Sequence, residues 1–429
     1  MKSELLVVGT MAAACVSVLA ESAHPHHGED GQKHPIQPHE HAESRMLLNK
    51  FENSLERASD AGVSIAGEYV YEYTNVLDGG VKSGGSDRNL FVFDAEFDLE
   101  NIFGLKGATV FAQYLHVNAE RGGSADAGDI QGFTNIGSDR SMDVLYELWF
   151  EQKFADGKYR VKVGKVDANS EFNYVDAGGN FSNSSAGFSP TIFTFPTYPN
   201  PAMSVNVFAT LVENDVTAFT VGYGLNDGGT AVDGVETGRS GPSSYFSGDS
   251  SNDYFHILQG EQTWESLCSL DEGRLSAGAW YHSGSFETFS GGSDSGAFGF
   301  FFTAEQRLTT RAEDSAEGIY VFAQYATADE NVSEIAQHIA LGLMSEGSVA
   351  GRSSDSAGVY VTYVDLSDDS YANDGDGFAK DECTIDAFYR FQLNDHFALQ
   401  PEVQYILNPS GSSSVSDALI GGVRFSASF

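Results

Sequence analysis

The sequence predicts an all-β protein, a closed antiparallel transmembrane β-barrel of about 16 strands with a short N-terminal helix. The first observation is that apolar and polar residues alternate one by one over long stretches of the 429-residue chain. The second is that about sixteen such segments, each about 10 residues long, follow residue 61. The third is that the last segment runs to the final residue, Phe429. Alternation with period two is typical of strands that have one apolar and one polar face.

The alternation is clearest in three segments near the start of the expected barrel. In residues 63–74 the apolar and aromatic positions share one face, and Glu68, Glu72 and Thr74 lie on the other. Residues 90–99 repeat the pattern, with phenylalanines opposite acidic residues. In residues 144–154 the expected outer positions are Val144, Tyr146, Leu148 and Phe150, and the expected inner positions are Glu147, Trp149 and Glu151. An aromatic-rich outer face is expected of strands that face lipid.

The connections between the expected strands alternate between short and long. Asn394 and Asp395 form a short connection, whereas residues 119–141, 227–252 and 283–296 form long ones. An even number of strands with alternating short and long connections is typical of bacterial outer-membrane barrels. The strands of a soluble β-sandwich are usually shorter, nearer five or six residues. The last expected strand, 419–429, would close the barrel by pairing with the first, because lipid cannot satisfy an open edge.

The chain divides into four expected regions. Residues 1–20 are typical of a signal peptide, because Lys2 precedes an apolar stretch and small residues suit cleavage near Ala20. Residues 21–43 form a His-rich tail with too little apolar surface to fold alone. Residues 44–60 are expected to form a short amphipathic helix, and residues 61–429 the outer-membrane β-barrel.

The tail, the charge and the cysteines limit the possible ligands. Clustered histidines can bind divalent metal ions. The irregular spacing of these histidines favours instead a flexible tail, with at most an adventitious divalent cation, and the chain is expected to have no resident cofactor. The net charge of −38 argues against nucleic acid, whose phosphates need Lys and Arg to neutralise them. Beyond the signal peptide only Cys268 and Cys383 remain, and the sequence leaves open whether they pair. The tail histidines are His24, His26, His27, His34, His39 and His41.

Several segments of the chain resemble one known family. They are Leu145 to Gln152, Arg160 to Lys165, Asp167 to Asn169, Phe172, Phe181 to Ser185, Pro190, Tyr198-Pro199, Leu399 to Pro409, Gly421, Arg424 and Phe429. Together they resemble the OprB-type carbohydrate-selective porins over about residues 55–429. The resemblance implies a sixteen-stranded outer-membrane pore for the passive uptake of sugars. Some relatives carry an N-terminal peptidoglycan-binding module, and this chain has the His-rich tail instead.

A sugar channel needs polar side chains for the hydroxyl groups and aromatic rings that lie against the sugar. An acidic wall beside a basic wall would create a transverse field that orders water, and the alternative is that these charges only pair with each other and keep the wall rigid and hydrated. Residues 167–201 are expected to fold into the pore as a constriction, with simple surface exposure as the alternative. The candidate channel residues are Glu147, Trp149, Glu151, Arg160, Lys162, Lys165, Asp167, Asn169, Trp280, Arg390, Gln400, Glu402, Gln404 and Arg424.

Two other functions compete with a sugar channel. An outer-membrane hydrolase is less favoured, because the sequence has no G-x-S-x-G or H-E-x-x-H motif, and the chain is expected not to be an enzyme. A general cation-preferring porin is the other, since an acidic lumen would suit cations. The expected partners are sugars, outer-membrane lipid, lipopolysaccharide and the barrel-assembly machinery, which would bind the strand that ends at Phe429. A monomer and a homotrimer both remain open.

Overall fold

The structure is a computed structural model that describes residues 54–118, 122–229, 237–239, 244–246, 253–266, 271–310, 317–347, 349, 351–371 and 380–429. The chain forms two compact units, Met1–Ala61 and Gly62–Phe429. In the first unit, residues 54–60 are helical, as expected for the end of the predicted helix. The signal peptide, the six tail histidines and Cys268 lie outside the described residues. Cys383 forms no disulfide with any described residue.

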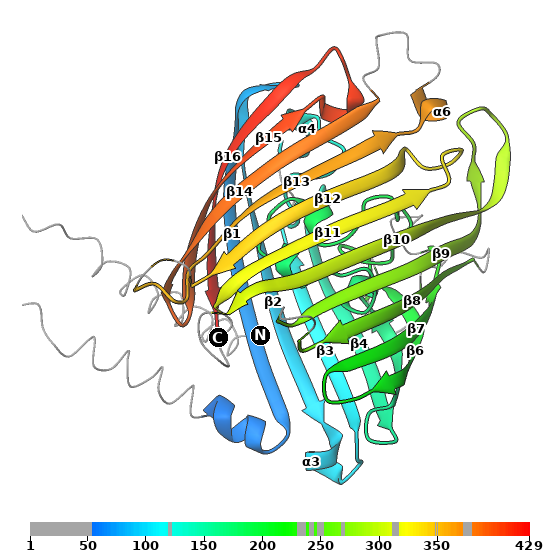
Figure 1. Ribbon diagram of the computed structural model, residues 1–429, viewed down its shortest axis with the longest axis vertical. Coiled ribbons are helices and arrows are strands. Elements are labelled where there is room, and N and C mark those ends of the chain that lie inside the picture. Colours follow the sequence, from blue (N-terminus) through cyan, green and yellow to red (C-terminus); the bar gives the residue numbers. More distant parts are fainter. Residues whose placement is uncertain are drawn as a thin grey trace, which may run out of the picture. The chain divides into compact units, whose positions relative to one another are not determined.

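The second unit is a closed barrel of sixteen antiparallel strands, in which each strand pairs with its neighbours in the sequence and β1 pairs with β16 (Figure 1). This confirms the predicted fold class and strand count. The strands are β1 (Val63–Gly80), β2 (Gly84–Asp98), β3 (Ala108–Val117), β4 (Met142–Phe154), β5 (Tyr159–Val166), β6 (Ala202–Glu213), β7 (Thr217–Asp227), β8 (Tyr254–Trp264), β9 (Gly273–Glu287), β10 (Ser293–Thr310), β11 (Gly318–Ala328), β12 (Ile335–Glu346), β13 (Ser356–Leu366), β14 (Asp381–Asn394), β15 (Phe397–Leu407) and β16 (Ser416–Ser428).

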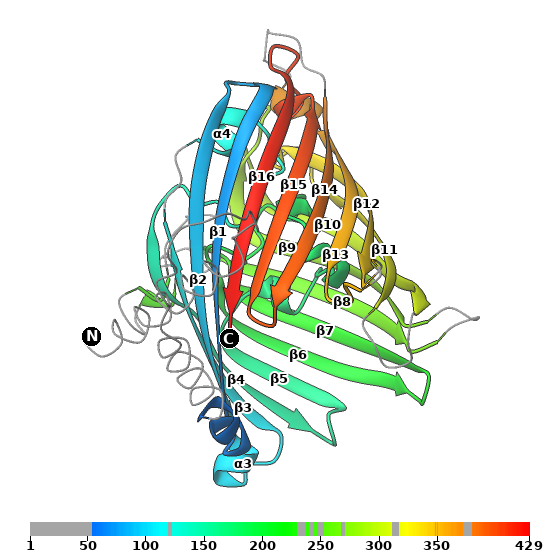
Figure 2. The ribbon, with the colours of Figure 1, turned by 90° about the vertical axis from the view of Figure 1, so that its left-hand side faces the viewer.

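The barrel closes at the last residues of the chain, as predicted. Figure 2 shows β2, β1, β16 and β15 side by side. In this register Tyr71 is opposite Phe425, and Glu72 is opposite Arg424. The backbone of Phe429 exchanges two hydrogen bonds with Gly67, N to O at 3.0 and 3.2 Å. The first and last strands therefore have no open edge along their paired lengths, which a strand inside a membrane requires.

The barrel wall has an apolar, aromatic outer face and a polar inner face. On β1, Tyr69, Tyr71 and Tyr73 are exposed on the outside, whereas Glu72 and Thr74 are buried inside. Long strands with this alternation can cross a membrane, because each backbone polar group is paired within the sheet and the outer side chains contact lipid. Within the described residues, no helix is long and apolar enough to cross a membrane.

The prediction for the outer face of β4 is partly wrong. Tyr114 pairs with Leu145 and Gln113 pairs with Glu147, so Tyr146 is an extra residue in a β-bulge. A bulge shifts the alternation by one position, because two residues of one strand then lie opposite one residue of the other. Val144 and Tyr146 are consequently buried inside the barrel, whereas Phe150 is exposed outside as predicted.

The helical elements are short and lie in the connections. Asp98 caps the helix that follows β2, accepting hydrogen bonds from the backbone N of Glu100 (2.8 Å) and Asn101 (3.3 Å), and Gly104 ends it with a φ of 73°. This capping separates β2 from β3 with a compact turn. The helices between the described strands include α3 (Leu99–Phe103), α4 (Ser124–Ala127) and α6 (Asp368–Tyr371), and the 3₁₀ turns include η1 (Ala168–Ser170), η2 (Asp176–Gly178), η3 (Ser184–Ala186) and η5 (Pro409–Gly411).

Candidate solute channel

Residues 167–201, which connect β5 to β6, lie inside the barrel; we call them the inner loop. Phe181 of this loop is 0% exposed, and its ring centroid lies 4.8 Å from Phe388, 5.4 Å from Tyr360 and 5.9 Å from Phe322. These three rings belong to β14, β13 and β11, on the far side of the strand order from β5. The inner loop therefore crosses the lumen, which confirms the prediction that this segment folds into the pore.

Polar side chains of the wall hold the inner loop at several points. Ser182 donates a hydrogen bond of 2.5 Å to Glu402, and Gln400 donates one of 2.9 Å to the carbonyl oxygen of Asn180. The backbone N of Ala177 donates to Glu305 at 2.7 Å. Gln400 and Glu402 thus face inward as predicted, but their polar atoms bind the loop.

A second connection, residues 122–141 between β3 and β4, also enters the barrel. Glu382 accepts hydrogen bonds from the backbone N of Ile130 (2.9 Å) and Gln131 (3.2 Å). Gln404 donates to the carbonyl oxygen of Phe133 at 2.7 Å. The sequence indicated this segment only as a long connection. The inward-facing carboxylate of Glu382 and amide of Gln404 on the facing strands are the signal that could have shown its path.

Glu72 joins this second connection to the closing strands. It accepts from Arg88 at 2.5 Å, from Arg424 Nε at 2.8 Å and from the Thr134 hydroxyl at 2.7 Å. Arg424 also donates to Asn135 Oδ1 at 2.8 Å. The predicted inward direction of Arg424 is correct, and its guanidinium is neutralised by Glu72 rather than free in the channel.

The charged residues of β4 and β5 pair across the start of the inner loop. Arg160 lies 2.8 Å from Glu151 and 2.6 Å from Glu171, and Lys162 forms ion pairs with the same two carboxylates. Burial alone would raise the pKa of Glu171, but Arg160 and Lys162 more than offset this and lower it. The two predicted walls therefore neutralise each other, and Glu171 of the inner loop completes the network.

Aromatic rings alternate with these cations along the inner wall. Trp149 stacks on Phe111 with centroids 5.0 Å apart, and Lys162 Nζ lies 3.8 Å from the Trp149 ring centroid. Arg160 lies over Phe208 at 3.8 Å. Cation–π contacts of this kind fix the direction of both side chains. Trp149 is only partly buried, as expected for a ring on the channel wall.

Three predicted channel residues, Glu147, Asp167 and Asn169, instead fix the base of the inner loop, and a fourth, Lys165, bonds to residues outside that loop. Glu147 accepts from the backbone N of Asp167 at 2.8 Å, and Asp167 accepts from the Tyr146 hydroxyl at 2.5 Å. Asn169 donates to three loop carbonyl oxygens at 3.4–3.5 Å. Lys165 is fully buried and donates to the carbonyl oxygens of Leu145 (2.9 Å) and Thr237 (2.7 Å). The first three residues position the loop, whereas Lys165 links β5 to β4 and to Thr237.

Trp280 and Arg390 differ from each other in accessibility. Trp280 is 2% exposed, because it stacks on Phe255 (6.0 Å) and meets the edge of Phe193 (5.8 Å). The prediction that it presents an aromatic face to the channel is therefore wrong. Arg390 lies on the same strand face as Phe388, is only partly buried, and forms no hydrogen bond or ion pair within the described part of the chain.

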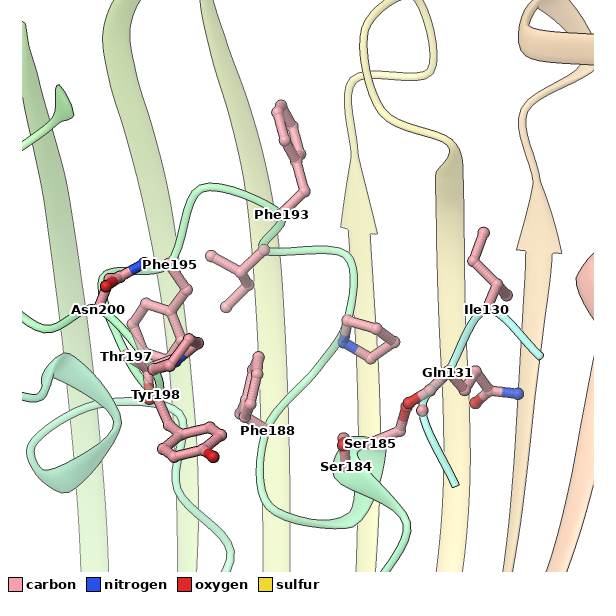
Figure 3. Close-up of a pocket in the computed structure, with 14 residues that line it drawn as sticks. Ile130, Gln131, Ser184, Ser185, Phe188, Phe193, Phe195, Thr197, Tyr198 and Asn200 are labelled. Atoms are coloured by element: carbon pink, nitrogen blue, oxygen red, sulfur yellow. The ribbon is translucent and has the colours of Figure 1, made fainter. Parts of the chain in front are cut away.

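A cavity of about 360 Å³ lies between the inner loop and the second connection, and we call it the neutral cavity (Figure 3). Its rings include Phe193, Phe195 and Tyr198, and Figure 3 shows Ser184 and Ser185 on the side opposite Phe195 and Tyr198. None of its lining residues is charged. They are Ile130, Gln131, Gly132, Ser184, Ser185, Phe188, Pro190, Ile192, Phe193, Phe195, Thr197, Tyr198, Pro199 and Asn200.

A second cavity, of about 680 Å³, lies at the end of the barrel that carries the short turns, and we call it the acidic basin. It is lined by Tyr174, Asp176 and Ala177 of the inner loop and by residues at the ends of β6 to β12. The two cavities share no lining residue. Within the described residues, no group of three or more His, Cys, Asp or Glu could hold a metal ion.

A closed antiparallel barrel with a lipid-facing outer wall, a polar inner wall and an inward-folded loop defines an outer-membrane porin. Residues 82–429 match the family described as carbohydrate-selective porin, OprB family, and the chain belongs to that family of channels. It is a porin of the outer membrane and not an enzyme.

Known proteins support this assignment over most of the chain. Porin B of Pseudomonas aeruginosa is 22% identical over 433 residues, which cover 90% of this chain and 92% of that protein. The high-pH structure of Pseudomonas putida OprB has a TM-score of 0.77 at 20% identity, covering 89% of this chain and 97% of that one. Its low-pH structure has a TM-score of 0.53 at 18% identity, covering 89% and 98%. The structural likeness concerns the fold.

Proposed function

We propose that this porin carries small sugars by passive diffusion into the periplasm, and that the neutral cavity is where a sugar first binds. The observation that carries this proposal is the lining of that cavity, which combines aromatic rings with hydroxyl and amide groups and contains no charged side chain. Sugar rings have apolar faces and hydroxyl-covered edges, so this combination suits a neutral sugar better than an ion.

The position of the cavity supports its role at the outer mouth. It is lined by the two connections that fold inward, and both leave the barrel at the end that carries the long connections. In outer-membrane barrels the long connections are extracellular and the short turns are periplasmic. A sugar from outside would reach the neutral cavity first, then the charged side chains at the base of the inner loop, and the acidic basin last.

Export, assembly and lipid contacts complete the proposal. Residues 1–20 would direct export and be removed near Ala20. The strand that ends at Phe429 would be recognised by the barrel-assembly machinery, and the outer aromatic band would contact lipid and lipopolysaccharide. Removing residues 21–43 tests whether the His-rich tail contributes to conductance or to metal binding.

Conductance of the purified porin in planar bilayers, measured with increasing glucose or maltose, tests the proposal. We expect the sugar to block the current, and Phe193→Ala to weaken that block by roughly threefold to tenfold, because an aromatic contact is worth about 0.5–1.5 kcal/mol. Phe193 lines the neutral cavity and is partly exposed. Phe298→Ala on the lipid-facing surface is the matched control and should leave the block unchanged.

The same measurement distinguishes the alternatives. A cation current that no sugar blocks would favour a general cation-preferring porin, for which the excess of acidic over basic residues in the lining of the acidic basin is the supporting observation. Absence of any conductance from correctly folded protein would contradict both functions.

A further inference from the structure

A buried histidine lies behind the neutral cavity. His338 of β12 is 0% exposed and lines neither cavity. Its Nδ1 lies 3.0 Å from the hydroxyl oxygen of Ser189, and its Nε2 lies 3.0 Å from the hydroxyl oxygen of Thr362 on β13. Ser189 belongs to the inner loop and lies between Phe188 and Pro190, which both line the neutral cavity. One ring nitrogen therefore holds the loop directly behind the cavity.

The other ring nitrogen reaches the second connection through Thr362. The Thr362 hydroxyl donates to Gln131 Oε1 at 2.6 Å, and Gln131 Nε2 donates to Glu382 at 3.1 Å. Gln131 belongs to the second connection and lines the neutral cavity (Figure 3). His338 thus lies in the middle of a chain of hydrogen bonds that joins the two connections whose residues form the cavity.

The direction of each bond in this chain follows from the carboxylate at its end. A carboxylate only accepts hydrogen bonds, so Glu382 turns the Gln131 amide nitrogen toward itself and leaves the amide oxygen for Thr362. Thr362 uses its one hydroxyl hydrogen on that oxygen and therefore accepts from His338 Nε2. A neutral imidazole has one donor and one acceptor, so His338 Nδ1 accepts from the Ser189 hydroxyl. The chain consequently selects a single tautomer of His338.

Every side chain in this chain is shielded from water. The exposed fraction is 0% for His338, Thr362 and Glu382, 1% for Ser189 and 3% for Gln131. A buried polar group that loses its partner cannot replace it with water, so cutting the chain leaves unsatisfied groups on both sides of His338. The chain therefore resists a change in the distance between Ser189 and Gln131.

Direct bonds between the two connections fix the opposite side of the cavity. The backbone N of Ser184 donates to the carbonyl oxygen of Gly132 at 2.8 Å. The aromatic side is connected to Ser189 instead: its carbonyl oxygen accepts from the backbone N of Ile192 at 3.2 Å, and that of Ile192 accepts from the backbone N of Phe195 at 2.9 Å. Holding Ser189 in place therefore also holds the turn that carries the Phe195 ring.

We propose that His338 is a positioning residue for the sugar site, which sets the distance between the aromatic side of the neutral cavity and the side that carries Gln131. This inference rests on the proposed function and deepens it. His338 acts through Ser189 and Thr362 and does not touch the sugar. Cutting the chain should weaken sugar binding and leave the open-channel conductance unchanged, because the ion pairs at the base of the inner loop do not belong to the chain.

Two valine substitutions at paired positions give the sharpest test. Thr362 and Thr384 lie opposite each other on β13 and β14, and both are 0% exposed. The Thr384 hydroxyl forms no hydrogen bond with any described residue, so Thr384→Val is the matched control. In planar bilayers, Thr362→Val should raise the glucose concentration that blocks half of the current on the order of tenfold, because buried groups lose their partners, whereas Thr384→Val should leave it unchanged.

Substitutions of His338 itself separate hydrogen bonding from packing. His338→Gln keeps a planar group with an acceptor and a donor side by side and should retain most of the wild-type affinity for glucose. His338→Leu fills the site without either bond and should lose affinity as Thr362→Val does. The current without sugar should be the same in all these variants, and circular dichroism checks that each barrel has formed.

The outcomes distinguish this proposal from the proposed function. Equal shifts in Thr362→Val and Thr384→Val, or in His338→Gln and His338→Leu, would overturn the positioning role, because altered packing would then explain the effect. A sugar block that Thr362→Val and His338→Leu leave unchanged would also overturn it and keep the sugar channel intact. A change in the sugar-free current that parallels the loss of block would contradict it too, since the whole loop would have moved. Absence of any sugar block in the wild-type protein would instead overturn the proposed function, and this inference with it.

Discussion

The anchoring of the inner loop by Phe181 leads to a quantitative prediction. Phe181 is fully buried and its ring contacts Phe322, Tyr360 and Phe388, so Phe181→Ala removes three aromatic contacts and leaves a cavity. Buried Phe→Ala substitutions cost about 3–5 kcal/mol. At about 3 kcal/mol, the equilibrium for detaching the middle of the loop rises on the order of a hundredfold.

Single-channel recording measures this detachment directly. Wild-type protein should show one steady current level, whereas Phe181→Ala should switch frequently to a level of higher conductance when the loop leaves the wall. Phe300→Ala makes the same chemical change on the exposed outer face of β10 and should behave as wild type. If Phe181→Ala gives the same level and the same noise as Phe300→Ala, this ring does not hold the loop, and the argument from its burial fails.

Three further predictions concern the internal charges and rings. Glu72→Gln should destabilise the barrel by about 3–5 kcal/mol in urea unfolding, because Arg88 and Arg424 would lose their shared buried carboxylate, whereas Glu96→Gln should have little effect. Burial and the Glu382 carboxylate raise the pKa of Asp129 from 3.8 to about 7. The contribution of protonated Asp129 to the stability of the folded protein is therefore complete below pH 4 and is lost as pH rises through 7. Proteolysis of residues 122–141 should increase over that pH range, and Asp129→Asn should remove the pH dependence. Trp149→Ala should remove the ring that covers the Lys162 ammonium, which keeps its ion pairs with Glu151 and Glu171, and should increase the salt dependence of conductance because that ammonium becomes more accessible to the channel water. Trp280→Ala should not show this effect, because Trp280 is buried.

The barrel could be predicted from the sequence because period-two alternation depends only on residue type. The aromatic outer positions of β1 and the terminal position of Phe429 follow from that pattern, and the structure confirms both. The position of the inner loop could also be predicted, since residues 167–201 are too long for a turn and match the family pattern.

The contacts across the lumen could not be predicted in the same way. Alternation shows that Glu72 and Arg424 face inward, but their pairing depends on the register between β1 and β16, which a strand's own sequence does not determine. The bulge at Tyr146 reverses the face of Val144 without any residue type that marks it. Trp280 was expected on the channel because nothing in its own strand shows that Phe193 of the inner loop covers it.

The sequence distance between the inner loop and its partners has a consequence for biogenesis. Ser182 binds Glu402, which is 220 residues later in the chain, and Gln404 binds Asn183 across 221 residues. These partners lie on β15, the strand next to the last, so these two contacts cannot form until the wall is almost complete. The loop can contact Phe322 on β11 and Tyr360 on β13 earlier, but its polar anchors at Ser182 and Asn183 depend on the strand that is added next to last. The last strands therefore close the wall and also fix the middle of the loop inside it.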